Sequence, residues 1–160
     1  MSEADYRASL DVKASVRRLA PGDPLDRVVE LFQRTTQFNT TGRKFTVAEL
    51  AALIANPAQA VFSLNVSDRF GDHGLTGAIV VCGGEIVGLA VSCRVLGLGA
   101  EQAFMREVIA QLALSHPRLT ARIVETARNA PVRNVYRDAG FTQGDDGGWR
   151  LETAARRSAA

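Results

Sequence analysis

The stretch EIVGLAVSCRVLGLG, residues 85–99, decides the fold prediction. An apolar run of strand length breaks into a turn with two glycines, after which Phe104, Val108 and Leu112 recur at helical spacing, with Met105 and Ile109 beside them. A strand, a glycine turn and a helix in this order leave unpaired backbone N–H groups at the positive end of the helix. The turn is either a plain structural connection or a site for an anion such as a pyrophosphate.

Upstream of this stretch the pattern predicts one strand and two helices. Residues 13–19 form the strand, and Asp23 caps a helix that begins at Pro24. A polar loop covers residues 35–45. The second helix follows a capping box at residues 46–49 and ends at Asn56-Pro57. The expected buried positions are Leu25, Val28, Val29 and Phe32 in the first helix, and Val47, Leu50, Ala51 and Ile54 in the second.

The remaining elements complete an alternating order of strands and helices. Strands are expected at 60–67, 75–82 and 85–93, joined by a long hairpin loop at 68–74 and a two-residue turn at Gly83-Gly84. After the helix that follows the glycine turn come a strand at 119–124, a helix at 131–139 ended by Gly140, and a strand at 149–151. The predicted order is β-α-α-β-β-β-α-β-α-β, an α/β (α+β) fold with a mixed, mostly antiparallel sheet flanked by helices.

Composition bounds the class of protein. The chain has 160 residues, 46% of them hydrophobic and 22% charged, which suits one globular domain at 12–153 between flexible segments at 1–11 and 154–160. A net charge of +2 with scattered arginines gives no support to nucleic-acid binding. No run is long and apolar enough for a membrane span. Cys82 and Cys93 form neither a disulfide framework nor a metal site, and no metal is expected. We therefore expect a cytoplasmic protein.

Strand directions bring the loops to one edge of the sheet. If the first four strands are antiparallel neighbours, the glycine turn and the 68–74 hairpin loop share an edge, and the 35–45 loop returns there. A helical crossover makes the 119–124 strand parallel to 85–93, so that residues 125–129 arrive at the same edge. Converging loops above a rigid sheet are typical of a ligand site.

These residues match a known family pattern. The order of elements, the Arg94-x-x-Gly97-x-Gly99 turn, and Asn129, Tyr136 and Gly140-Phe141 resemble the GNAT acyltransferase superfamily. Residues 35–43, 67–72 and 92–97 more narrowly resemble the C-terminal GNAT-like domain of FkbH-like proteins, which follows a HAD-type glyceryl transferase/phosphatase domain. No Asp-x-Asp motif of that HAD-type domain occurs in this sequence. The resemblance therefore does not imply phosphatase or glyceryl-transfer chemistry for this chain.

The resemblance implies a cofactor site between the fourth and fifth strands. Acetyl-CoA, another acyl-CoA or the phosphopantetheine thioester of a carrier protein would lie there. Glycines permit close approach of phosphate to backbone, whereas Leu98 stands where relatives often have a basic residue. The residues implied in cofactor binding are Val91, Arg94, Val95, Leu96, Gly97, Leu98, Gly99, Ala100 and Asn129.

Three side chains are candidates for catalysis. Tyr136 is either the general acid that reprotonates a thiolate or a packing residue of its helix. Glu125, at the end of a strand, is the preferred general base, with Asp68, Asp72 and His73 reaching the same edge. Cys93 is either a covalent acyl carrier or a small strand residue. The acceptor would be lined by Gln37, Asn39, Thr41, Arg43 and Arg69, which otherwise are solvated loop residues.

The implied function is acyl transfer from a CoA or carrier-protein thioester to an amine or other nucleophile, in polyketide or secondary-metabolite biosynthesis. The alternative is a non-catalytic GNAT-like module that docks an acyl carrier protein or a HAD-type partner domain, and a third is a sensor of CoA thioesters. A monomer or a homodimer is expected.

Overall fold

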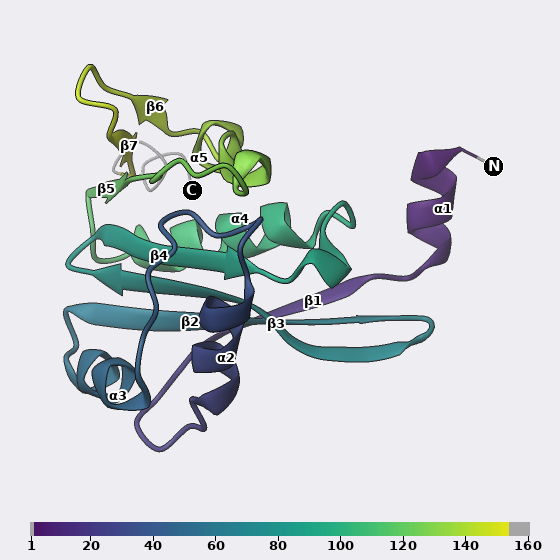
Figure 1. Cartoon of the computed structure of the whole chain (residues 1–160), viewed down its shortest axis with the longest axis horizontal. Helices are drawn as coiled ribbons and strands as arrows, with labels where there is room; N and C mark the ends of the chain where they lie inside the picture. Colours follow the sequence, from purple (N-terminus) through teal and green to yellow (C-terminus); the bar gives the residue numbers. More distant parts are fainter. Residues whose placement is uncertain (1, 154–160) are drawn as a thin grey trace.

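A seven-stranded sheet organises the fold (Figure 1). The computed structural model describes residues 2–153, except for the side chains at positions 3 and 7, and the tail predicted at 154–160 lies outside the described residues. The strand order is β1-β2-β3-β4-β5-β7-β6, and only β4 and β5 pair in parallel. The predicted mixed, mostly antiparallel sheet is confirmed. The strands are β1 (Lys13–Arg18), β2 (Gln59–Asp68), β3 (Gly71–Cys82), β4 (Glu85–Val91), β5 (Arg118–Ala121), β6 (Thr142–Gln143) and β7 (Trp149–Glu152).

Helices cover both faces of the sheet and bury two apolar clusters. On one face, α2 (Asp26–Arg34) and α3 (Val47–Ala55) pack over Val61 and Val80. On the other, α4 (Ala100–Leu112) and α5 (Val135–Asp138) pack over Phe62 and Ile79, next along β2 and β3. Neighbouring residues of a strand point to opposite faces, which explains the division. No helix within residues 2–153 is long and apolar enough to cross a membrane.

Several predicted boundaries differ from the structure. A helix, α1 (Glu3–Ser9), forms in the segment predicted to be flexible, and the Ser2 hydroxyl accepts a hydrogen bond from the Asp5 N–H (3.0 Å) at its start. The hairpin loop at 68–74 is shorter than predicted, since Asp68 already pairs with Gly71. The strand predicted at 119–124 ends at Ala121, and the short β6 was not predicted. The helix predicted at 131–139 is divided into η2 (Ala130–Val132) and α5.

The two predicted helix caps have opposite outcomes. The capping box at Thr46 and Glu49 is confirmed, with both reciprocal hydrogen bonds present. The Asp23 cap is wrong, because α2 begins at Asp26 after Leu25. The carboxylate of Asp23 accepts the N–H of Ala20 and the Arg17 guanidinium instead, each at 2.7 Å. The Asp23 carboxylate is therefore engaged within this turn and does not accept an N–H group from the start of the helix.

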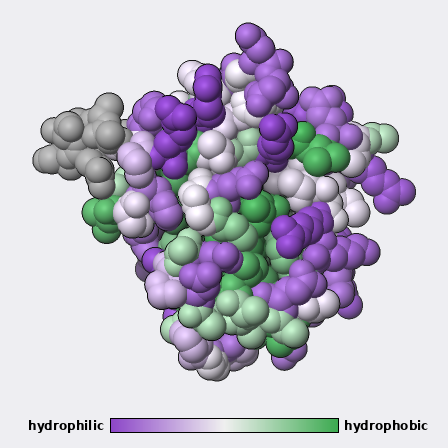
Figure 2. Space-filling model, turned by 90° about the vertical axis from the view of Figure 1, so that its left-hand side faces the viewer, coloured by the Kyte–Doolittle hydropathy of each residue, from purple (hydrophilic) through white to green (hydrophobic). Residues whose placement is uncertain are grey.

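Helix α3 buries a narrower face than its sequence predicts. Leu50 is fully buried and Ile54 is partly buried, but Val47 is 44% exposed and Ala51 is also exposed. The helix lies at the bottom of the molecule in Figure 1, and Figure 2 shows hydrophobic surface in the corresponding lower part of the adjacent face. The prediction of Val47 and Ala51 as buried is therefore wrong, because α3 packs mainly on β2 through Leu50, Leu53 and Ile54.

Gly88 of β4 lets two aromatic rings approach the sheet. Phe32 of α2 and Phe45 pack edge to face with ring centroids 4.8 Å apart. A Cβ atom on Gly88 would lie 3.0 Å from the Phe45 ring and 3.2 Å from the Phe32 ring. This contact anchors both ends of the loop at residues 35–45, which the candidate site uses.

We predict that Gly88→Ala lowers the free energy of unfolding by about 1–3 kcal/mol, because the added methyl group overpacks this contact. Urea unfolding measures the change. Adding Phe45→Leu should recover part of the loss, since the shorter side chain makes room. A Gly88→Ala protein with the urea midpoint of the parent would show that the rings move away without cost.

Candidate active site

β4 and β5 separate after a short parallel pairing. Only Glu85 with Thr120 and Ile86 with Ala121 are in register. β5 ends there, whereas β4 continues to Val91. The edge of β4 that faces β5 therefore presents backbone groups beyond the pairing that need other partners. This gap lies where the family resemblance places the pantetheine arm of the cofactor.

Residues 38–40, hereafter the inserted strand, pair with this edge of β4. They run antiparallel to β4 and are centred on an isolated bridge between Asn39 and Ala90. Two backbone hydrogen bonds flank the bridge: Thr40 N–H donates to the Leu89 carbonyl (3.1 Å), and Val91 N–H donates to the Phe38 carbonyl (3.0 Å).

The chain beyond β5 binds the other side of the inserted strand. Val124 N–H donates to the Thr40 carbonyl at 2.8 Å. The buried Asn129 amide donates to the carbonyls of Asn39 (3.1 Å) and Val124 (2.8 Å) and so joins the two segments. The loops at 35–45 and 125–129 do meet at the end of β4, as the strand directions predict. In this conformation, however, Val91, Asn39 and Asn129 bind the chain itself.

Phe38 forms part of two cavities. The first, of about 560 Å³, lies between α2 and the end of β4, and Gln37, Cys93 and Arg94 also line it. The second, of about 400 Å³, lies between α4 and α5 and is lined by Glu101, Met105 and Val135 among others. We call the first the α2 cavity and the second the α4 cavity. One buried side chain of the inserted strand, 6% exposed, thus borders both.

The glycine turn combines an open surface with free donors. η1 (Cys93–Val95) follows β4, and Gly97 and Gly99 have φ of 81° and 83°, which favour glycine. A Cβ atom on either would meet nothing within 4 Å. The N–H groups of Val95, Leu96 and Leu98 donate within the turn. Those of Gly97, Gly99 and Ala100 donate to no acceptor in residues 2–153, so the expected phosphate cradle narrows to these three.

Three buried side-chain oxygens in the described part of the chain lack a hydrogen-bond partner, and all three adjoin the gap. They are Thr40 Oγ1, Glu101 Oε2 and Tyr136 Oη. Thr40 belongs to the inserted strand, and Glu101 lines the α4 cavity beside Phe38. A native structure leaves few buried polar atoms unpaired, so a cluster of three marks this region as the candidate site.

Tyr136 is fully buried, with its hydroxyl near the Thr40 side chain of the inserted strand. Its ring packs against Phe141 and Trp149, at centroid distances of 5.2 and 6.4 Å. Burial raises the pKa of the Tyr136 hydroxyl well above its ordinary value. The Thr40 hydroxyl lies near enough to offset part of that rise, although the two groups do not meet in hydrogen-bond geometry. Tyr136 therefore packs in the core, and its catalytic role stays a prediction.

The other candidate residues are spread over the surface. Glu125 is exposed next to Val124, and Cys93 is exposed in the α2 cavity. Thr41 accepts the N–H of Arg43, whose guanidinium lies over the Phe45 ring. Arg69 stacks on Phe70 at the tip of the β2–β3 hairpin and lines none of the cavities described above.

The alternative bases of the hairpin interact with each other or with its backbone. His73 Nε2 lies 2.8 Å from Asp68 Oδ2, and the His73 hydrogen bond is the main cause of the lowered pKa of Asp68. Asp72 accepts the N–H of Gly74 (2.7 Å). These contacts give the three residues a local role in the hairpin.

The sequence interpretation missed five residues that shape this region. Phe38 and Thr40 of the inserted strand fall inside the loop segment that resembles FkbH-like proteins, which was the one signal available. Glu101 is an ordinary acidic residue in the first turn of a helix. Arg27 and Arg34 lie on α2 and line the α2 cavity, which no local pattern predicts.

Solved structures share this arrangement of elements. The ribosomal-protein-S18-alanine N-acetyltransferase of Escherichia coli superposes with a TM-score of 0.62 at 17% identity, covering 88% of this chain and 94% of that chain. A putative GNAT-family acetyltransferase from Desulfovibrio desulfuricans gives 0.59 at 20% identity over 88% and 99%. The chain has the GNAT fold.

The GNAT fold also includes an enzyme of polyamines. The spermidine/spermine N-acetyltransferase of Vibrio cholerae superposes with a TM-score of 0.59 at 14% identity, covering 92% of this chain and 97% of that chain. No protein-family model matches the sequence, and no curated protein matches it. Identities this low establish the GNAT fold alone.

We predict that Thr40→Val leaves the free energy of unfolding unchanged or raises it by up to about 1 kcal/mol, because it removes an unpaired buried hydroxyl. Thr76 is the matched control. It is equally buried, but its hydroxyl donates to the Leu64 carbonyl at 3.4 Å. Thr76→Val should therefore destabilise the fold by about 1 kcal/mol in the same urea titration. Equal losses for the two variants would contradict an unpaired Thr40.

Proposed function

We propose that this protein is a GNAT-type acyltransferase that takes an acyl group from acyl-CoA and transfers it to an amine. The observation that carries this proposal is the cluster at the β4–β5 gap: three free N–H groups at the glycine turn and three unpaired buried oxygens beside it. Unpaired backbone N–H groups at the N-terminus of a helix commonly bind phosphate groups. The gap, the turn and the helix have the order that the fold family uses for acyl-CoA.

The residues fit acyl-CoA at its phosphate end. Gly97, Gly99 and Ala100 would donate to the pyrophosphate, with the dipole of α4 favouring the negative charge. Glu101 Oε2 could accept a hydrogen bond from the amide-bearing arm in the α4 cavity. The gap itself is closed by the inserted strand. The proposal therefore requires residues 38–40 to leave β4 when the donor binds.

When bound, acyl-CoA supplies a thioester whose acyl carbon accepts the nucleophile. The chain has to hold a proton for the leaving sulfur, and Tyr136 Oη is the candidate. A phenol is protonated at neutral pH, and burial raises the pKa of Tyr136 further. Departure of the inserted strand would open its surroundings to the reaction. Glu125 is the proposed base for the amine, since its carboxylate is exposed at the far side of the gap.

Cys93 is proposed only as a residue of the acceptor side. Its sulfur lies in the α2 cavity, on the opposite side of Phe38 from the α4 cavity where the arm of the donor would lie. The cytoplasm, which contains acyl-CoA, is the proposed compartment.

The second candidate function is a non-catalytic module that docks a carrier protein or a HAD-type domain in polyketide biosynthesis. The observation that favours it is the closed gap with Tyr136 fully buried below it. Such a module would bind a carrier protein without an acyl group, and the binding would survive Tyr136→Phe. An acyltransferase would instead lose turnover in that variant.

The first test is binding of CoA by titration calorimetry. We predict that CoA binds the parent protein and that Gly99→Glu abolishes binding, because the variant places a carboxylate in the phosphate cradle. Gly147→Glu is the matched control, since φ is 83° at Gly99 and 84° at Gly147 and neither glycine has an atom within 4 Å of its Cβ position. Both variants carry the same backbone strain. Loss of binding in both, or in neither, would contradict the cradle.

The second test concerns the inserted strand. If it must leave the gap, Phe38→Leu should strengthen CoA binding, by about tenfold for each 1.4 kcal/mol by which the closed form is weakened. Phe45→Leu is the control. Phe45 is as deeply buried in the same loop but packs in the other apolar cluster. It should lower stability without strengthening binding. Unchanged affinity in Phe38→Leu would mean that the closed gap does not oppose the donor.

A further inference from the structure

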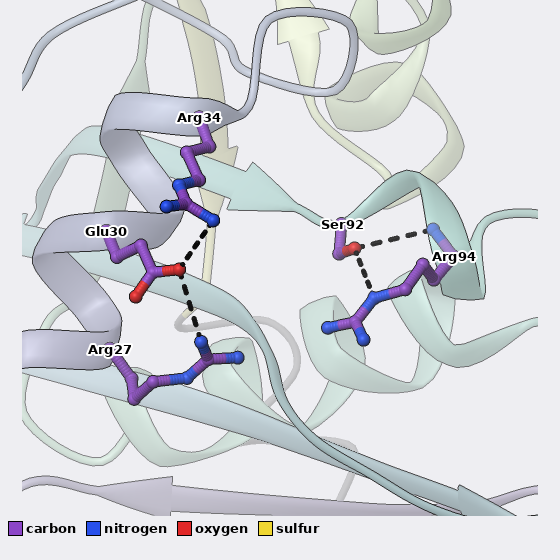
Figure 3. Close-up of polar contacts among 5 residues, drawn as sticks. All are labelled: Arg27, Glu30, Arg34, Ser92 and Arg94. Atoms are coloured by element: carbon purple, nitrogen blue, oxygen red, sulfur yellow. Dashed lines mark hydrogen bonds and ion pairs between the residues drawn. The ribbon is translucent and has the colours of Figure 1, made fainter.

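The α2 cavity is lined by three arginines and one acid. Arg27 and Arg34 come from α2, and Arg94 comes from the turn after β4. Figure 3 shows the guanidinium groups of Arg27 and Arg94 pointing into the space between these two elements. The remaining lining residues are neutral or, in one case, the acid Glu30. A cavity of about 560 Å³ with these walls has room for a small metabolite.

The single acid leaves the positive charges incompletely neutralised. Glu30 Oε1 lies 3.3 Å from Arg27 Nη1 and 3.0 Å from Arg34 Nη1, so one carboxylate oxygen serves two guanidiniums. Arg94 donates only to the Ser92 hydroxyl, at 3.4 Å, and forms no ion pair within the described residues (Figure 3). Two positive charges in excess therefore face one cavity. Guanidinium forks bind carboxylates and other oxyanions in pairs of hydrogen bonds.

The α2 cavity is also next to the proposed reaction site. Phe38 separates it from the α4 cavity, where the arm of the donor would lie. When residues 38–40 leave β4, that wall is removed. A ligand held by the arginines would then be one side chain away from the acyl group.

We propose that the α2 cavity binds the acceptor and that this acceptor is an amine carrying carboxylate groups, such as an acidic amino acid. The inference rests on the proposed acyl transfer and adds its acceptor class. Arg27, Arg34 and Arg94 hold the carboxylates, and the amine faces Phe38. The same arginines repel polyamines, so this chain differs in acceptor from the spermidine/spermine enzyme that shares its fold.

Binding is tested without any acyl donor, with L-glutamate as the probe and spermidine as the opposite charge type. Calorimetry should detect glutamate binding that weakens as salt is added. Arg27→Gln and Arg94→Gln should each weaken it by about tenfold, which is the loss of one charge-assisted hydrogen-bonded contact. Arg122→Gln is the control. Like Arg27 it is an exposed arginine with one ion pair, at 3.4 Å to Asp146, but it lies outside this cavity.

The outcomes separate this inference from the proposed function. Spermidine binding in place of glutamate, or glutamate binding that is equally affected by Arg122→Gln, would overturn the acceptor class. Glutamate binding that depends on Arg94, combined with no CoA binding, would support the anion site in the α2 cavity. The same result would count against acyl transfer as the function of the protein. With both ligands bound, release of free thiol from acetyl-CoA should be faster with glutamate than with spermidine. The reverse preference would overturn the inference while leaving acyl transfer in place.

Discussion

The early separation of β4 from β5 is the constraint on which the rest of the structure depends. Two residue pairs hold the strands together, and β4 then continues toward the glycine turn without β5, paired with β3 on its other edge. A buried strand cannot leave its N–H and C=O groups unpaired at low cost. Something must therefore lie beside Leu89 and Val91. In this conformation it is the chain itself, through residues 38–40.

The pairing of residues 38–40 with β4 explains several otherwise separate features. Asn129 is buried because its amide joins the inserted strand to the chain after β5. Phe38 borders both cavities because the inserted strand lies between α2 on one face of the sheet and α4 and α5 on the other. Tyr136 is fully buried against Phe141 and Trp149, and its hydroxyl remains unpaired because the nearby Thr40 hydroxyl is not aligned with it.

The sequence predicts the parts of the fold that short-range patterns determine. The Gly83-Gly84 turn follows from its need for positive φ, and the Thr46 capping box from groups three residues apart. Asp23 does not cap the helix because its carboxylate accepts the N–H of Ala20 and closes a turn there instead. The strand directions correctly bring the loops to one edge.

Short-range patterns do not predict that residues 38–40 fill the gap between β4 and β5. Asn39 pairs with Ala90, and Thr40 with Val124, over sequence separations that no local pattern encodes. The arginines of the α2 cavity are likewise assembled from two distant elements. A resemblance to a family places a ligand between β4 and β5 by analogy with relatives in which that gap is open. It does not reveal that residues 38–40 of this chain pair with β4 there.

The inserted strand has a consequence for selectivity among phosphate-bearing metabolites. A small anion such as inorganic pyrophosphate could reach the donors of Gly97, Gly99 and Ala100, yet it offers no amide groups to exchange for the hydrogen bonds at Leu89 and Val91. An arm with amides at strand-like spacing can make that exchange. If acyl-CoA binds as proposed, the closed gap would select for the length and chemistry of the arm, whereas a small anion bound only at the turn would leave residues 38–40 in place.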